Sequence, residues 1–265
     1  MDKVLLSVAP VSATETHIDP KKIAEDVIEC EKTGAGMVHL HVRDLHGKLT
    51  DNLEVFRETV ERIREKSNIV IEASTGGVSN LTIQQRCAPL YYDMVECASL
   101  NVGSVNLGEA VYQNPIDEVR YCVGEILKTK KTPEVEVFEI GMIHTTVQLY
   151  KDFAIPDPLL LSIVLGHEGA APATIEALVA MRSFIPDNMA WGITHSRRQS
   201  NDIITAAVGM GAKTVRIGFE DSPYIDAGQI SQTNAPIVAH FAKLLGAMGK
   251  APMTPDEARQ AFCIA

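Results

Sequence analysis

The sequence predicts a single-domain (β/α)8 barrel, in which eight parallel strands alternate with helices around one core. The chain has 265 residues, of which 46% are hydrophobic, and a single barrel of this class needs roughly 250 residues. Short apolar segments alternate with amphipathic ones throughout residues 1–265, without a linker or low-complexity tract. An open doubly wound sheet is the alternative, but no apolar segment is followed by the G-x-G-x-x-G turn typical of many such sheets.

Eight short apolar segments are expected to be the strands. They cover residues 4–9, 37–42, 69–73, 94–98, 135–140, 159–165, 189–193 and 214–217. Helical periodicity is clearest at residues 20–32, 52–65, 116–128, 174–184 and 198–210, and a last helix is expected near residues 235–248. Asp19 and Pro20 are typical of a helix start, and Gly34 of a helix end. Strands that alternate with helices pair in parallel, and eight such units favour closure into a barrel.

Composition narrows the classes of partner. The formal net charge of −10 argues against nucleic acid or an anionic membrane surface, since both attract basic proteins. The longest apolar runs, such as residues 158–165, are far shorter than the ~18 residues of a membrane span, and the N-terminus lacks the pattern of a signal peptide. The five cysteines form no CxxC pair, which is typical of reduced thiols in a cytoplasmic protein.

A candidate metal site follows from two expected strand ends. His39 and His41 lie two residues apart on the second strand, so both side chains point to the same face, at the end where a barrel's active site opens. Glu220 follows the eighth strand, whose end faces the same mouth. Three protein ligands with an open position are typical of catalytic zinc. Two hydrogen-bonded histidines and a solvent-facing glutamate are the alternative.

Other strand ends carry small or acidic residues. Residues 74–77 read Ser-Thr-Gly-Gly, and residues 103–108 read Gly-Ser-Val-Asn-Leu-Gly. Glycines let the backbone approach a ligand and offer N–H donors, although each run also reads as a simple turn. Glu134 and Glu136 are expected on one face of the fifth strand.

These runs together resemble the β-keto acid cleavage enzymes, a family typified by 3-keto-5-aminohexanoate cleavage enzyme. The resemblance extends nearly end to end and is carried by the HLHVRD run at residues 39–44, the STGG run at 74–77, the GSVNLG run at 103–108 and the VRIGFED run at 215–221. It implies a zinc-dependent TIM barrel that forms a homo-oligomer, a tetramer in the family. The implied reaction converts a β-keto acid and acetyl-CoA into acetoacetate and a new acyl-CoA.

The resemblance also implies roles for individual residues. Zinc is assigned to His39, His41 and Glu220, and the catalytic group to Asp221, Arg216 and Glu136. Substrate contacts are assigned to Glu15, Ser74, Gly77 and Ser104. In the implied mechanism Asp221 is the base and Arg216 holds it in place.

Several loop residues have two alternative roles. The acidic substrate contact expected after the first strand falls on Glu15 or, with a shift of one residue, on Thr14. His167 and Glu168 either contact substrate or CoA or face water. Arg197 and Arg198 either contact the CoA phosphates or begin a solvated helix. The identity of the keto acid is not readable from these loops.

Two other functions compete with this hypothesis. A metal-dependent aldolase or hydrolase on the same barrel is the first, and independence from acetyl-CoA would distinguish it. A barrel that keeps its metal site but only binds or regulates is the second. The complete set of metal and charged residues at the strand ends argues against the second function.

Overall fold

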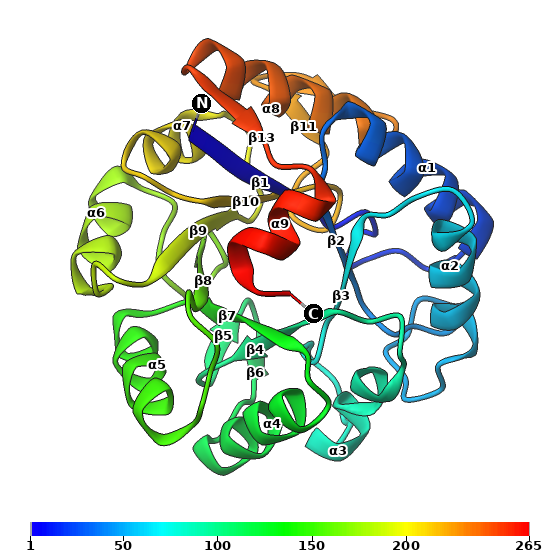
Figure 1. The fold of residues 1–265 in the computed structure, drawn as a ribbon, viewed down its shortest axis with the longest axis vertical. Helices are drawn as coiled ribbons and strands as arrows, with labels where there is room; N and C mark the ends of the chain where they lie inside the picture. Colours follow the sequence, from blue (N-terminus) through cyan, green and yellow to red (C-terminus); the bar gives the residue numbers. More distant parts are fainter. Residues whose placement is uncertain (1, 265) are drawn as a thin grey trace.

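The eight expected strands form a closed ring. A computed structural model describes residues 2–264, and Figure 1 shows the strands inside a circle of helices. The last strand of the ring returns to the first, with Leu5 opposite Thr214, so the predicted (β/α)8 barrel is confirmed. The strands of the ring are β1 (Asp2–Val8), β2 (Met37–Leu40), β3 (Val70–Ala73), β4 (Cys97–Asn101), β7 (Thr132–Val137), β8 (Leu160–Leu165), β9 (Ala190–His195) and β10 (Thr214–Ile217).

Helices cover the outside of the ring and bury their apolar faces against it. They are α1 (Pro20–Thr33), α2 (Glu54–Arg64), α3 (Ile83–Arg86), α4 (Ile116–Lys128), α5 (Ile140–Asp152), α6 (Ile175–Phe184), α7 (Asp202–Gly209) and α8 (Ala235–Ala247), with a 3-10 turn η1 (Ala88–Tyr91). Helix α1 begins as predicted, because the Asp19 side chain accepts hydrogen bonds from the first free backbone N–H groups. Between residues 2 and 264, no helix combines the length and the apolarity needed to cross a membrane.

The N-terminal end of the barrel is plugged by the last part of the chain. Strand β13 (Lys250–Pro252) pairs with β1, and helix α9 (Pro255–Phe262) then lies across the centre of the ring (Figure 1). Phe262 and Ile264 pack against Leu5, Met37 and other strand residues in a buried cluster at this end. The strands' carboxyl ends therefore form the other end, where barrel active sites lie.

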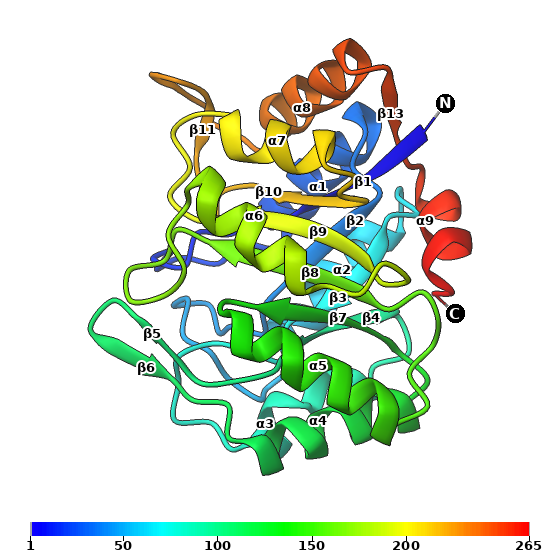
Figure 2. The same cartoon turned by 90° about the vertical axis from the view of Figure 1, so that its left-hand side faces the viewer.

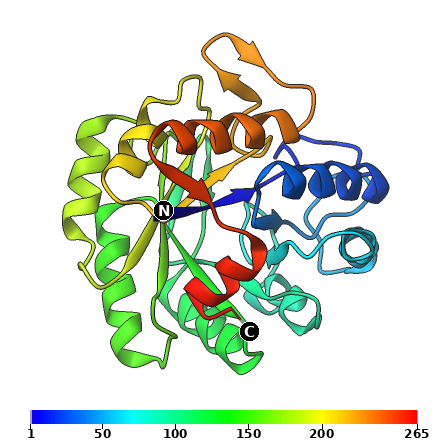
Figure 3. The same ribbon diagram turned by 45° about the horizontal axis from the view of Figure 1, so that its top comes forward.

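Two β-hairpins that the sequence analysis did not foresee project from the carboxyl end, opposite α9 (Figure 2). The first joins β5 (Val105–Leu107) to β6 (Ala110–Tyr112), and the second joins β11 (Tyr224–Asp226) to β12 (Gln229–Ile230). Figure 3 shows the second hairpin standing clear of α8. The first hairpin contributes Leu107, Gly108 and Tyr112 to the wall of the barrel mouth.

Three predicted elements differ most from the structure in their boundaries. The fourth strand runs from Cys97 to Asn101 rather than over residues 94–98, because Met94 is partly exposed before the strand begins. The fifth runs from Thr132 to Val137 and includes Pro133, and Ile140 already begins α5. A continuous apolar run does not distinguish the end of a buried strand from the start of a helix. The helix expected from residue 198 starts at Asp202, after the turn that buries Arg198.

Candidate active site

Three potential metal ligands meet at the carboxyl ends of β2 and β10. Ligand atoms of His39, His41 and Glu220 all lie within 4.8 Å of one another. Glu220 Oε1 lies 3.3 Å from His41 Nε2 and 4.0 Å from His39 Nε2. Donors placed ~2.0–2.2 Å from a tetrahedral zinc ion are roughly 3.3–3.6 Å apart. The residues therefore fit a divalent metal, and the clustering expected from the sequence is confirmed.

A carboxylate behind His39 fixes the orientation of its ring. Glu72 lies opposite His39 on β3, and Glu72 Oε2 is 2.7 Å from His39 Nδ1, with both side chains fully buried. Because Nδ1 is occupied by this contact, Nε2 is the nitrogen left for a metal. Ligating histidines in metal sites usually have such a carboxylate partner. The role of Glu72 is not readable from the sequence, because it depends on the strand register that places Glu72 against His39.

A second buried carboxyl group lies beside Glu72. Burial raises the pKa of Glu72 to about 7, and burial together with the nearby Glu72 raises the pKa of Glu134 well above the usual glutamate range. The interaction between the two groups lowers the pKa of Glu72 and raises that of Glu134, so the proton is held by Glu134 and Glu72 remains the acceptor for His39.

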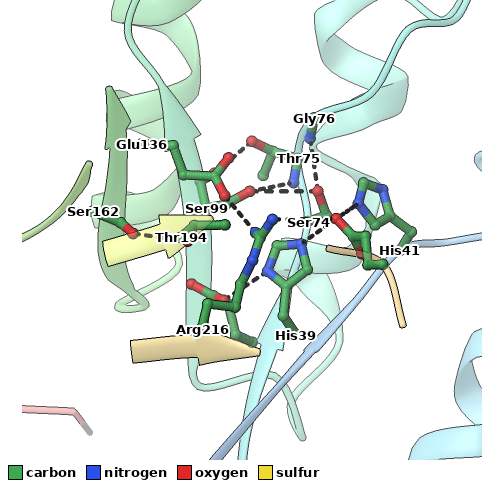
Figure 4. Close-up of polar contacts among 12 residues, drawn as sticks. His39, His41, Ser74, Thr75, Gly76, Ser99, Glu136, Ser162, Thr194 and Arg216 are labelled. Atoms are coloured by element: carbon green, nitrogen blue, oxygen red, sulfur yellow. Dashed lines mark hydrogen bonds and ion pairs between the residues drawn. The ribbon is translucent and has the colours of Figure 1, made fainter. Parts of the chain in front are cut away.

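Arg216 gathers the carboxylates beside the metal cluster. Its Nε and Nη2 donate to the two oxygens of Asp221, at 3.0 and 2.8 Å. Its Nη1 donates to Glu136 Oε1 at 2.6 Å (Figure 4). Glu220 lies 3.5 Å from Nη2. Burial opposes the charge of Arg216, but the carboxylates of Asp221 and Glu136 hold its pKa above the usual arginine value. Burial alone would likewise raise the pKa of Glu220, yet His41 and Arg216 hold it well below its usual range.

These groups line one cavity of about 730 Å³ at the barrel mouth. Its volume is sufficient for a small acid together with part of a larger co-substrate. Leu107, Tyr112 and Phe138 supply apolar wall, while Arg216, Asp221 and the metal cluster supply charge. These apolar residues come from the first hairpin and from the end of β7, and none of them was predicted from the sequence to line the site.

The predicted substrate contacts divide into two groups. Ser74 and Gly77 line the cavity, whereas Glu15 and Ser104 are absent from its wall within residues 2–264. The Ser104 hydroxyl instead accepts a hydrogen bond from the Asn114 N–H at 2.8 Å. Thr14 does line the cavity, so the structure favours Thr14 over Glu15 at the open N-terminal position.

Ser74 also organises the loop that carries Gly77. Its hydroxyl accepts a hydrogen bond from the Gly76 N–H at 3.2 Å and lies 3.4 Å from the Ser99 hydroxyl (Figure 4). Gly77 has φ +127°, a conformation that favours glycine, and a Cβ there would lie 2.4 Å from a Leu49 methyl. The STGG run is therefore a shaped wall of the cavity rather than a simple turn.

The remaining histidines and arginines of the loops have different surroundings. His167 lines the cavity beside Phe138, and burial lowers its pKa. His195 lies outside the metal cluster, and burial lowers its pKa to about 4.

Arg197 lines the cavity, whereas Arg198 is buried and donates to Asn201 and to the Tyr224 carbonyl. Arg198 is therefore a structural residue and does not face a CoA phosphate.

The fold and the site define the class of protein: a (β/α)8-barrel enzyme with a candidate metal site and an arginine-bound aspartate at the mouth. The chain belongs to the beta-keto acid cleavage enzyme family, whose family model matches residues 5–264.

Two named relatives agree with this assignment, and a solved structure matches the fold. The chain is 33% identical to a 3-keto-5-aminohexanoate cleavage enzyme of Fusobacterium nucleatum, over 98% of this chain and 97% of that protein. It is 30% identical to a 3-oxoadipate:acetyl-CoA acetyltransferase of Cupriavidus necator, over 86% and 81%. The structure of a binary complex of ObcA with oxaloacetate matches the fold with a TM-score of 0.78 at 18% identity, over 94% of this chain and 67% of that one.

Proposed function

We propose that this chain is a zinc-dependent enzyme that converts a β-keto acid and acetyl-CoA into acetoacetate and a new acyl-CoA. The observation that carries the proposal is the Asp221–Arg216 ion pair beside His39, His41 and Glu220 at the floor of one cavity. The similarity to a 3-oxoadipate:acetyl-CoA acetyltransferase supports the same reaction class with acetyl-CoA as the co-substrate. Homo-oligomeric assembly is part of the proposal, and light scattering after gel filtration tests it.

His39, His41 and Glu220 would hold the zinc ion. When bound, zinc supplies a Lewis acid that stabilises negative charge on the oxygens of a β-keto acid. Cysteine is absent from the candidate ligand set, and the two histidines and one carboxylate match a catalytic zinc site with a position open for substrate.

Asp221 is the proposed base that removes the proton from C2 of the keto acid. Arg216 binds both of its oxygens and is itself fixed by Glu136, so the carboxylate is held in one orientation. The C2 carbanion then forms a bond to the acetyl carbonyl carbon of acetyl-CoA as the acetyl C–S bond breaks, and the CoA thiolate released in this way bonds to the former ketone carbon C3. The C2–C3 bond breaks to give the acyl-CoA and acetoacetate, whose C2 recovers the proton from Asp221.

The test is to mix the zinc-loaded protein with acetyl-CoA and a panel of β-keto acids and to follow acetoacetate and acyl-CoA by mass spectrometry. His39→Ala should abolish both products, while His144→Ala, which alters an exposed histidine on α5, should keep them. Turnover without acetyl-CoA, or no product from any acid despite bound zinc, would favour the aldolase or hydrolase alternative.

A further inference from the structure

The charge of the cavity bears on the substrate's tail, meaning the part of the keto acid beyond its ketone. This inference rests on the proposed function. The names of the relatives describe tails of opposite charge: 3-keto-5-aminohexanoate carries an amine, and 3-oxoadipate carries a second carboxylate. The walls of the cavity distinguish between such tails by charge complementarity.

Each carboxylate on the cavity wall already has a basic partner. Arg216 binds Glu136 and Asp221, and Glu220 lies against His41. At the rim, Glu168 lies 3.7 Å from Arg197. Within residues 2–264, the wall therefore offers no unpaired carboxylate to receive an ammonium tail.

Glu15, the acidic residue nearest to this wall in the N-terminal loop, turns away from the cavity. Its Oε1 accepts hydrogen bonds from the Thr16 and His17 N–H groups, at 2.9 and 3.0 Å. The side chain lines a separate groove beside Lys22 on the outside of the barrel. These two hydrogen bonds hold the carboxylate in the loop, and Glu15 is not among the residues that line the cavity.

Two cations on the same wall have no such partner. Arg43 and Lys48 line the cavity, and neither has a carboxylate within 4.0 Å in the described part of the chain. Arg43 is only 7% exposed, and its Nη1 donates to the Ser12 carbonyl at 2.8 Å. Its Nε is buried without a protein partner among residues 2–264. An unsatisfied buried guanidinium group is costly unless a ligand completes its contacts.

The N-terminal loop brings two hydroxyl groups next to these cations. Asp44 Oδ1 accepts the N–H groups of His46 and Lys48, both at 2.9 Å, and so shapes the turn that carries Lys48. Gly47 in this turn packs on the loop so closely that a Cβ would lie 1.9 Å from the Glu15 carbonyl oxygen. The hydroxyls of Ser12 and Thr14, 3.1 Å apart, line the cavity from that loop.

We propose that Ser12, Thr14, Arg43 and Lys48 form an anion subsite for the tail of the substrate, which is then a β-keto dicarboxylate. Two cations and two hydroxyl groups complement a carboxylate, and the same charges disfavour an ammonium group. The shared chemistry also suits the phosphates of CoA, so the experiment must separate the two anions.

The test compares kcat/KM for three β-keto acids of equal length whose tails end in a carboxylate, a methyl group or an amine. The dicarboxylate should be the best substrate of the three. Lys48→Gln should lower kcat/KM for the dicarboxylate by about 10-fold or more, as expected for loss of a charged hydrogen bond, and leave the methyl-ended acid within about twofold. Lys243→Gln, an exposed substitution on α8, is the matched control and should change neither value.

Other outcomes would overturn the subsite. A rise in the KM of acetyl-CoA with every acid would assign Lys48 to CoA phosphates. If the enzyme instead prefers the amine-ended acid and Glu168→Gln removes that preference, the tail binds at the Glu168–Arg197 pair on the rim. If no acid reacts, the proposed function is refuted, but the anion subsite can still be tested by calorimetry. The dicarboxylate should then bind the wild-type protein more tightly than the Lys48→Gln variant. Equal binding to the two proteins would refute the subsite.

Discussion

Replacement of Glu72 by leucine should weaken metal binding without unfolding the barrel. The leucine removes the acceptor 2.7 Å from His39 Nδ1, so the histidine ring loses the contact that directs Nε2 toward Glu220. Loss of such a partner typically weakens metal affinity by about 10–100-fold, which corresponds to roughly 1.4–2.7 kcal/mol. The apo protein should itself lose about 1–3 kcal/mol, because His39 Nδ1 is then buried without its acceptor, and this is less than the ~5–15 kcal/mol by which such domains are stable.

The assay has two readouts on protein stripped with a chelator. Zinc affinity is measured by competition with a chromophoric chelator, and stability by urea unfolding with and without zinc. The stabilisation added by zinc should fall by about the same 1.4–2.7 kcal/mol. Glu134→Gln is the matched control, because it changes a neighbouring buried carboxyl group that does not contact His39. A zinc Kd for Glu72→Leu within twofold of wild type would refute the reasoning.

Two further predictions concern catalysis and pH. Asp221→Asn should retain zinc yet lower kcat by roughly 10²–10⁴-fold, since a general base contributes about this much; a loss below tenfold would contradict its assignment. Glu134 has a pKa raised by burial, so its folded form binds a proton that the unfolded chain releases, and its contribution to stability is lost as pH rises above the usual glutamate range. The apo wild type should therefore lose stability relative to Glu134→Gln between pH 6 and 8.5, by at most ~1.4 kcal/mol per pH unit, in urea titrations. A difference that stays constant with pH would show that Glu134 is not protonated in the fold.

Strand periodicity was sufficient to predict the metal cluster. His39 and His41 are separated by two residues on one strand, and Glu220 follows the strand that closes the ring, so alternation and barrel topology together bring them to one mouth. Strand periodicity did not predict that the Glu72 carboxyl group contacts His39. Glu72 contacts His39 because β2 and β3 pair in one particular register, and a single sequence does not fix that register.

The conformation of the loops was the second feature that could not be predicted from the sequence. Glu15 and Thr14 are adjacent in sequence, yet one lines an outer groove and the other the cavity. The choice depends on how the N-terminal loop packs on Gly47, a contact between segments more than 30 residues apart. The position of Ser104 has a similar origin, because its hydroxyl accepts from the Asn114 N–H beyond a hairpin that was not predicted.

Along the barrel axis, the residues that stabilise the fold and the residues of the candidate active site lie in different layers. At the plugged end, Leu5, Met37 and Phe262 form an apolar cluster with α9, and this layer stabilises the ring without polar groups. Toward the mouth the interior becomes polar: the Ser162 and Thr194 hydroxyls lie 3.1 Å apart, and the glutamates and Arg216 follow (Figure 4). Because the lower layer and the helices already bury a large apolar surface, the upper layer can hold several charges that would otherwise destabilise a barrel core. The metal cluster and the Arg216 network occupy that upper layer, while the residues proposed to bind the tail lie on the loops around the mouth.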